Sequence, residues 1–131
     1  MADDASFQAG LNTRREVLGA EYVERSLAAA DEFTRPWQEF VTTHAWDAIW
    51  NRPGLDRRTR SIINLAALTA LGRGPELALH VRGALNNGVT PEEIREVFIQ
   101  LAGYAGFPAA VEAFRIAQPI IAEHRAAQGT R

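Results

Sequence analysis

Glu76 and His80 are the two residues of this sequence best placed to do acid–base chemistry. They lie four residues apart in a segment with helical periodicity, so both fall on one face, within roughly 40° of Gly83 and Asn87 at about 100° per residue. A carboxylate that accepts a hydrogen bond from an imidazole fixes the ring tautomer and raises its basicity, which suits proton transfer near neutral pH. The same spacing also fits a structural salt link, or a carboxylate that stabilises the first turn of its helix. Spacing alone does not decide between these roles.

Four other side chains are candidates for binding. His44 lies on the apolar side of its predicted helix, where a histidine is either a hydrogen-bonded core residue or a substrate contact. Arg57, Arg58 and Arg60 cluster at the start of another predicted helix, whose first backbone N–H groups also attract anions. Cations at this end oppose the helix dipole, so either neighbouring carboxylates or a bound carboxylate should offset them. The three histidines show no HExxH or comparable cluster, so we predict no metal site.

The residue types that the sequence lacks exclude several kinds of catalysis. There is no cysteine, which excludes a thiol nucleophile, a CxxC redox pair and a thiolate zinc site. All 14 basic residues are arginine, so no lysine can form a Schiff base with a keto substrate or with pyridoxal phosphate. The formal net charge is -2 and the arginines are scattered among carboxylates, so nucleic acid is not an expected partner. No segment approaches the ~20 apolar residues of a membrane span, and the first residues resemble no signal peptide, so we expect a cytoplasmic protein with no membrane partner.

The elements that position these side chains are predicted to be helices, because apolar residues recur at helical spacing along the whole chain. At 131 residues the chain is predicted to form one all-α domain, a bundle of about seven short helices, with about 1–8 and 126–131 mobile. The helices are predicted at about 11–18, at about 21–30, from a Thr34 cap to the turn at 51–54, from an Asp56 cap to Leu71, from Pro75 to Gly88, from the Thr90 capping box to Gly103, and from Pro108 onwards with a bend at Pro119.

The apolar pattern also predicts which helix faces are buried. The segment 62–68 is apolar nearly all round, so it should lie at the centre of the bundle. Several short helices rich in Ala, Leu and Phe leave apolar faces that a second copy would cover, so we expect a homo-oligomer. The helix after Thr34 should bury a single face, which is formed by Trp37, Phe40, Val41, His44 and Ala48.

Short motifs along nearly the whole chain carry a more specific prediction. HVRGALNNG spans 80–88, TPEEI spans 90–94 and YAGFPAA spans 104–110. Further matching segments lie at 18–19, 21–23, 25–28, 33–36, 58–61, 64–66 and 76–77. Together these segments resemble the carboxymuconolactone decarboxylase family, and the resemblance implies an all-α, alkylhydroperoxidase-like fold.

One branch of that fold family, the alkylhydroperoxidase-type proteins, places two cysteines seven and four residues before its histidine. Counted back from His80, these places hold Arg73 and Glu76 in this sequence. The acidic residue further upstream in the proton relay of that branch falls near Ser61. Redox chemistry of this type is therefore excluded, and the resemblance favours the decarboxylase branch.

The resemblance implies a carboxy-lyase that removes CO2 from 4-carboxymuconolactone and forms β-ketoadipate enol-lactone, a step of bacterial protocatechuate degradation. This substrate supplies its own electron sink, because the electrons of the lost carboxylate flow through the adjacent C=C into the lactone carbonyl, so no metal or organic cofactor is expected. The resemblance also implies a homo-oligomer, a hexamer. Two alternatives remain: a decarboxylase or isomerase-type member that acts on another small lactone or keto acid, and a helical oligomer without catalytic activity.

For the implied reaction we assign roles to five residues. His80 delivers the proton to the carbon α to the lactone carbonyl, and Glu76 orients the imidazole and tunes its pKa. Arg60, or else Arg35, binds the carboxylate that the product keeps, and His44 is a further candidate substrate contact. An apolar wall beside the departing carboxylate would favour its loss. The candidates for that wall are Trp37, Trp46 and Phe107.

Overall fold

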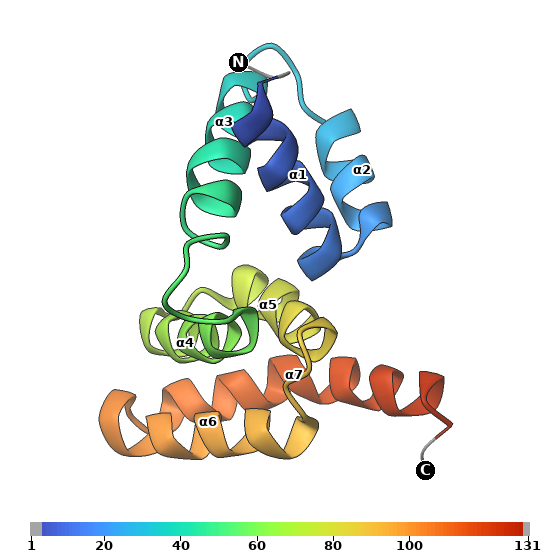
Figure 1. The fold of residues 1–131 in the computed structure, drawn as a ribbon. Coiled ribbons are helices and arrows are strands. Elements are labelled where there is room, and N and C mark those ends of the chain that lie inside the picture. The colour runs from blue at the N-terminus through green and yellow to red at the C-terminus, as the bar shows by residue number, and fades with distance from the viewer. Residues whose placement is uncertain (1–3, 130–131) are drawn as a thin grey trace. The chain divides into compact units, whose positions relative to one another are not determined.

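The structure is a computed structural model that describes residues 4–129 and consists of helices joined by turns and by a longer loop between η1 and α4 (Figure 1). The described residues contain no β-strand, so the predicted all-α class is confirmed. The helices are α1 (Ala5–Leu18), α2 (Ala20–Ala28), α3 (Arg35–Val41), the π-helix η1 (Thr42–Asp47), α4 (Arg57–Leu71), α5 (Gly74–Asn86), α6 (Pro91–Ala105) and α7 (Phe107–Ala127).

The first and last helices extend into the two ends of the chain that were predicted to be mobile. α1 begins at Ala5, because the Asp4 carboxylate accepts a hydrogen bond from the Phe7 N–H at 2.8 Å and caps the helix. Residues 5–8 are therefore part of a capped helix. At the other end α7 continues to Ala127. Residues 1–3 and 130–131, which belong to the same predicted ends, lie outside the described part of the chain.

The chain divides into two compact units, Met1–Arg57 and Arg58–Arg131. The first unit contains α1, α2, α3 and η1, and the second contains α4, apart from its first residue, and α5 to α7. Each unit has buried side chains of its own. Among residues 4–129, no helix combines the length and the hydropathy that a membrane crossing requires.

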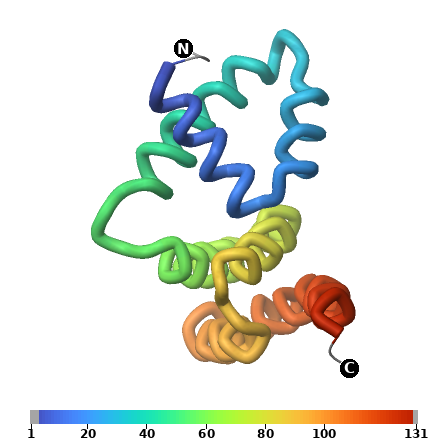
Figure 2. The backbone as a smooth tube through the Cα atoms, turned by 45° about the vertical axis from the view of Figure 1, so that its right-hand side comes forward, coloured from blue at the N-terminus to red at the C-terminus, as the bar shows by residue number. Residues whose placement is uncertain are grey.

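In the first unit, α1 packs directly against η1 (Figure 2). A Cβ atom at Gly10 would collide with the backbone carbonyl of Thr42, so this close approach requires a glycine. Trp46 and Trp50 are buried, and their stacked rings have centroids 5.1 Å apart. The first unit is therefore organised around one tight contact between two helices.

The side chains that α3 and η1 bury differ from the predicted ones. In η1 the N–H of Ala48 donates to the carbonyl of Thr43, and the N–H of Trp50 donates to that of Ala45, so each bond spans five residues. The extra residue per turn rotates the following side chains away from the face that a regular α-helix would bury. This rotation applies to His44 and Ala48, whereas Trp37 and Phe40 precede η1 and are exposed on α3 itself. The prediction of the inner face was wrong. The buried residues are Thr42, Trp46 and Trp50, and the exposed ones are Trp37, Phe40, His44 and Ala48.

Thr34 precedes α3 as predicted, but its side chain does not cap the helix. Its hydroxyl instead accepts a hydrogen bond from the Asp31 N–H and donates one to the Asp31 carboxylate. The same carboxylate accepts the N–H groups of Phe33 and Thr34, so Asp31 closes the turn that leads into α3.

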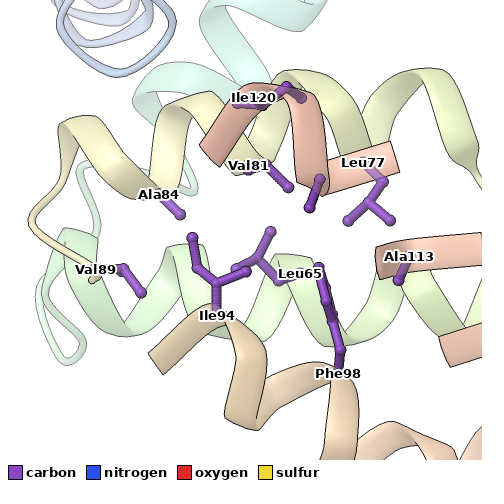
Figure 3. Packing of buried hydrophobic residues seen from close by; sticks show 10 residues of the cluster. Leu65, Leu77, Val81, Ala84, Val89, Ile94, Phe98, Ala113 and Ile120 are labelled. Atoms are coloured by element: carbon purple, nitrogen blue, oxygen red, sulfur yellow. The ribbon is translucent and has the colours of Figure 1, made fainter. Parts of the chain in front are cut away.

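The core of the second unit is one cluster of buried side chains from all four of its helices. Figure 3 shows Leu77 and Val81 of α5 on one side of the cluster, and Ile94 and Phe98 of α6 on the other, with Leu65 of α4 between them. α7 packs against both α5 and α6 and adds small residues such as alanine to the cluster. The helix that carries Glu76 and His80 therefore contributes directly to the buried core of this unit.

α4 buries one stripe of side chains only. Ser61, Leu65 and Thr69, spaced four residues apart, are buried, whereas Ile63 is 48% exposed. The expectation that the whole segment 62–68 is central therefore holds for one face and not for the other. A hydroxyl at each end of the stripe gives α4 a polar buried residue on either side of Leu65.

α6 begins at the predicted capping box. The Thr90 hydroxyl accepts a hydrogen bond from the Glu93 N–H at 3.1 Å, and the Glu93 carboxylate accepts one from the Thr90 N–H at 2.9 Å. Pro91 occupies the first turn, where its missing N–H costs nothing. At the far end Gly106, with φ of 104°, separates α6 from α7, and Pro119 lies inside α7.

Candidate active site

α5 carries both residues of the predicted acid–base pair. The helix begins after Gly72, whose φ of +70° favours glycine, and a proline in its first turn fixes the helical direction. Glu76 follows in that first turn, where the helix dipole favours a carboxylate. One turn later His80 is half-buried. The helix thus holds an exposed carboxylate one turn before a partly desolvated imidazole.

Burial sets the protonation state of His80. Desolvation lowers the pKa of the imidazole below its ordinary value, and the negative charge of Glu76 opposes this in part. The Nδ1 atom of the ring is itself buried. Because Glu76 is solvent-exposed, its charge is screened and does not outweigh the desolvation. The unliganded imidazole is therefore mainly neutral near pH 7, the opposite of the raised basicity that the spacing indicated.

A hydrogen bond between side chains fixes the start of α4 beside the end of α5. Asn87, which caps the C-terminus of α5, donates from Nδ2 to the Ser61 Oγ at 3.0 Å. Ser61 is fully buried. Asn87 lies two turns after His80 on the same face, about 10 Å along the helix axis at ~1.5 Å per residue. Arg60 directly precedes Ser61. The backbone of Arg60 therefore lies near the C-terminal end of α5, whereas Glu76 lies in the first turn of that helix.

The arginine cluster at the start of α4 is mostly occupied by ordinary ion pairs. Arg58 donates to the carboxylate of Glu93 in the capping box of α6. Arg57, the last residue of the first unit, pairs with Glu16 of α1 at 2.6 Å. The pKa of Glu93 is lowered by the Thr90 N–H first and by Arg58 second. Neighbouring carboxylates therefore offset Arg57 and Arg58. Arg60 is half-buried in α4 and belongs to the same unit as His80.

The predicted site residues fall into the two units. Glu76, His80 and Arg60 belong to the second unit, where the structure brings Glu76 close enough to His80 to influence its pKa. Arg35 and His44 belong to the first unit. Arg35 is the exposed first residue of α3, and the exposed His44 ring lies against the neighbouring Phe40 ring at a centroid distance of 4.3 Å.

The three aromatic candidates for an apolar wall have different surroundings. Trp46 is buried against Trp50 in the first unit, so its face is already covered. Trp37 and Phe107 are exposed, at 58% and 74%. Both are thus able to meet a ligand or a second copy of the chain.

Sequence reasoning noticed Ser61 and Asn87 but assigned neither of them a structural role. The signal was present, because a serine on the apolar stripe of a helix must find a hydrogen-bond partner when that stripe is buried. Which residue supplies the partner depends on how α4 and α5 pack, and this does not follow from either helix alone. Within residues 4–129, no group of three or more His, Asp or Glu side chains is arranged to hold a metal ion.

Comparison with known proteins gives a consistent assignment. A family model described as carboxymuconolactone decarboxylase family matches residues 35–119. The chain is 48% identical to the nitrosuccinic acid decarboxylase of Metarhizium robertsii over 88% of its own length and 80% of that protein. It is 42% identical to the 4-carboxymuconolactone decarboxylase of Acinetobacter baylyi over 92% of its own length and 90% of that protein. The helical unit that carries His80 and the extent of these matches establish that the chain belongs to the carboxymuconolactone decarboxylase family.

Proposed function

We propose that this chain is a cofactor-independent decarboxylase of a substituted succinate, a substrate in which the carbon that loses CO2 also bears an electron-accepting group. The observation that carries the proposal is the half-buried His80 on α5, next to Glu76, in a member of a decarboxylase family. The first candidate substrate is 4-carboxymuconolactone, which would give β-ketoadipate enol-lactone. The second is nitrosuccinate, and the similarity to an enzyme named for that acid favours it.

The two candidate substrates share a chemical pattern. In each of them one carbon bears the departing carboxylate, a CH2–COO⁻ arm and an electron sink. The sink is the unsaturated lactone in 4-carboxymuconolactone and the nitro group in nitrosuccinate. A site that holds the arm and stabilises negative charge on the sink oxygens would therefore serve either molecule.

The reaction needs one proton and no redox step. The bond between the carboxylate and its carbon breaks, CO2 leaves, and the electron pair moves into the sink as a dienolate or a nitronate. A proton then joins the carbon α to the lactone carbonyl or, in nitrosuccinate, the carbon that lost CO2. The protein has to orient the substrate, stabilise the sink oxygen and deliver that proton.

His80 suits the delivery of the proton because its charge can follow the charge of the substrate. The unliganded ring is mainly neutral, since burial lowers its pKa. A dianionic substrate beside the ring favours the imidazolium and raises that pKa on binding. The protonated ring then donates its proton to the dienolate or the nitronate, and it takes up a new proton from solvent. Glu76 supports the imidazolium in the same direction, because its negative charge raises the pKa of His80.

Arg60 is our first candidate for binding the CH2–COO⁻ arm, with Arg35 second and His44 as a further contact. Charge-assisted hydrogen bonds from a guanidinium to a carboxylate contribute roughly 1.5–3 kcal/mol each. The bond from Asn87 to Ser61 fixes the stretch of α4 from which Arg60 projects. An equally strong clamp on the departing carboxylate would stabilise the substrate and slow its reaction. Binding therefore belongs on the retained arm.

Self-association is part of this proposal. α7 exposes Phe107, Val111 and Phe114 on successive turns, and exposed apolar stripes of this kind are typical of protein interfaces. We propose that a second copy covers the stripe in a homo-oligomer, with the hexamer implied by the family resemblance as the first arrangement to test. Size-exclusion chromatography with light scattering measures the subunit number, and a monomer at micromolar concentration would contradict this part.

The activity is tested by mixing purified chain with 4-carboxymuconolactone or with nitrosuccinate and following substrate absorbance and released CO2. We expect turnover of at least one of the two, and the ratio of the two kcat/KM values identifies the preferred sink. A folded protein that releases no CO2 from either acid would contradict the decarboxylase proposal. In that case another small lactone or keto acid, or a role without catalysis, is the remaining explanation.

A further inference from the structure

Arg14 is a buried cation whose hydrogen-bond partners among the described residues are all neutral. Its side chain lies on the inner face of α1 and is 6% exposed. Nη1 donates to the Gln38 Oε1 at 3.0 Å and to the Thr42 Oγ1 at 3.1 Å, and Nη2 donates to the Ser26 Oγ at 3.4 Å. Nε is buried and makes no hydrogen bond with any residue of the described chain. Within residues 4–129, no carboxylate pairs with this guanidinium.

The neighbouring arginine shows how unusual this is. Arg15 is half-exposed, where a partner is least needed, and it nonetheless pairs with Glu24 at 2.6 Å. Arg14, which is deeply buried, pairs with no carboxylate in the part of the chain that the structure describes. Burial lowers the pKa of its guanidinium, yet arginine keeps its proton across the physiological range. A permanent charge in this position is unfavourable unless an anion offsets it.

The N–H groups of Arg14 that lack a short hydrogen bond have a defined geometry. Both hydrogens of Nη1 are used, by Gln38 and Thr42. The remaining side of the guanidinium is the fork formed by Nε–H and Nη2–H, which point in parallel. Ser26 holds Nη2 only by a long bond. A planar fork of two parallel N–H groups matches the two oxygens of a carboxylate.

The backbone around Arg14 holds this fork in place. Thr42, which fixes Nη1, is the first residue of the π-helix η1, and its own hydroxyl donates to the Gln38 carbonyl at 2.7 Å. The close approach at Gly10, one turn before Arg14, presses α1 onto the same residue. π-Helical turns are rare and are found frequently at functional sites. The orientation of the guanidinium is thus imposed by two helices, independently of any anion.

We propose that Arg14 is the binding residue of a carboxylate site in the first unit, with the carboxylate of a small organic acid seated on the Nε/Nη2 fork. When the acid binds, one of its carboxylate oxygens replaces Ser26 as the acceptor of the Nη2 hydrogen bond. Gln38 and Thr42 continue to accept the hydrogen bonds from Nη1. This site goes beyond the proposed function, which gives Arg14 no role. A carboxylate side chain of a second copy has the same chemistry, so the experiment separates the two sources.

Thermal unfolding of the full chain with succinate tests the proposal, with sodium chloride and neutral succinamide as controls at matched ionic strength. Succinate should raise Tm in a saturable way, because a ligand that binds only the folded state stabilises it. Arg14→Met should keep or raise the ligand-free Tm, because it removes an uncompensated buried charge, and should weaken succinate at least about tenfold. Arg15→Met, the matched control, should keep the response. No rise for the natural chain, or an undiminished rise for Arg14→Met, would overturn the proposal.

Arginine side-chain NMR gives a result even if Arg14→Met does not fold. The Nε–H signal of Arg14, assigned by its loss in Arg14→Lys, should move when succinate is added and stay in place with chloride or succinamide. A signal that does not respond overturns the site. A signal that moves with protein concentration alone shows a carboxylate from a second copy, and this outcome overturns the assignment to a small acid.

Discussion

His80 in the second unit and Arg14 in the first are both cationic side chains that the fold removes from water. Burial lowers the pKa of each, but the consequences differ. An imidazole responds by losing its proton, so His80 rests neutral and is ready to change its charge when an anion arrives. A guanidinium keeps its proton, so Arg14 carries a fixed charge and a fixed donor geometry. One unit therefore buries a group suited to moving a proton, and the other a group suited to holding an anion.

Replacing the imidazole is expected to have the largest effect. His80→Gln removes the proton donor but keeps a polar side chain of similar size, so kcat/KM should fall by about 10²- to 10⁴-fold. The matched control is His124→Gln, a histidine in the last turn of α7, which should stay within about threefold of the natural chain. Steady-state rates with the preferred acid, together with helicity by circular dichroism, make the measurement. A fully active His80→Gln would remove His80 from the mechanism.

Adding a methyl group at the close contact between α1 and η1 tests the first unit, which contains Arg14. Gly10→Ala places a methyl group against the Thr42 carbonyl, so the free energy of unfolding should fall by about 1–3 kcal/mol, and the succinate response should weaken as the Nη1 partner of Arg14 shifts. Gly103→Ala is the control, because a Cβ at this position in α6 meets nothing within 4 Å. It should stabilise the chain by about 0.5–1 kcal/mol. Urea unfolding of both variants measures the difference, and equal stabilities would show that the close approach is not needed.

The pH dependence of catalysis should reveal the coupling between Glu76 and His80. If the imidazolium donates the proton, kcat/KM falls as pH rises through the lowered pKa of the free enzyme, whereas kcat persists to higher pH because the bound dianion raises that pKa. Glu76→Gln removes the charge that raises the pKa of His80, so both limbs should move to lower pH. Limbs that stay in place would show that Glu76 has a structural role only.

The smallest expected effect is on stability in mild acid. The pKa of His80 is lowered in the folded state, so the unfolded state binds more protons as pH falls below the ordinary value of about 6.5, and stability is lost there. His80→Gln should remove this loss, while Arg14→Met should leave it unchanged because arginine does not titrate in that range. Urea midpoints near pH ~7.5 and ~5.5 give the comparison. An identical acid sensitivity in the natural chain and in His80→Gln would mean that the ring is not buried in its neutral form.

The sequence predicted the helices well where glycine, proline or capping residues mark the helix ends. Periodicity together with the Thr90 capping box placed the start of α6 correctly, and Gly72 with Pro75 placed the start of α5. The pairing of Glu76 with His80 on one helix followed from the same periodicity. These features depend on residues within one or two turns of each other, which is why a single sequence contains them.

The errors arose where packing decides the outcome. The π-helix η1 rotates the buried face after Val41, and nothing in the local sequence announces the extra residue per turn. The sign of the pKa shift at His80 depends on how much protein covers the ring. Arg14 was missed although it lies on the apolar stripe of α1 between Leu11 and Val17, because a cation at such a position usually reaches water along its stem. A charged residue at the centre of an apolar stripe was the signal that could have found it.

The carboxylate of Glu93 serves two helices at once. One oxygen accepts the Thr90 N–H at the start of α6, while the other receives the Arg58 guanidinium from the start of α4. Each link is worth little at a half-exposed position, but they share one side chain. The stability changes caused by substitutions at Thr90, Glu93 and Arg58 are therefore non-additive. A substitution at any one of these positions changes which residues the other two tolerate.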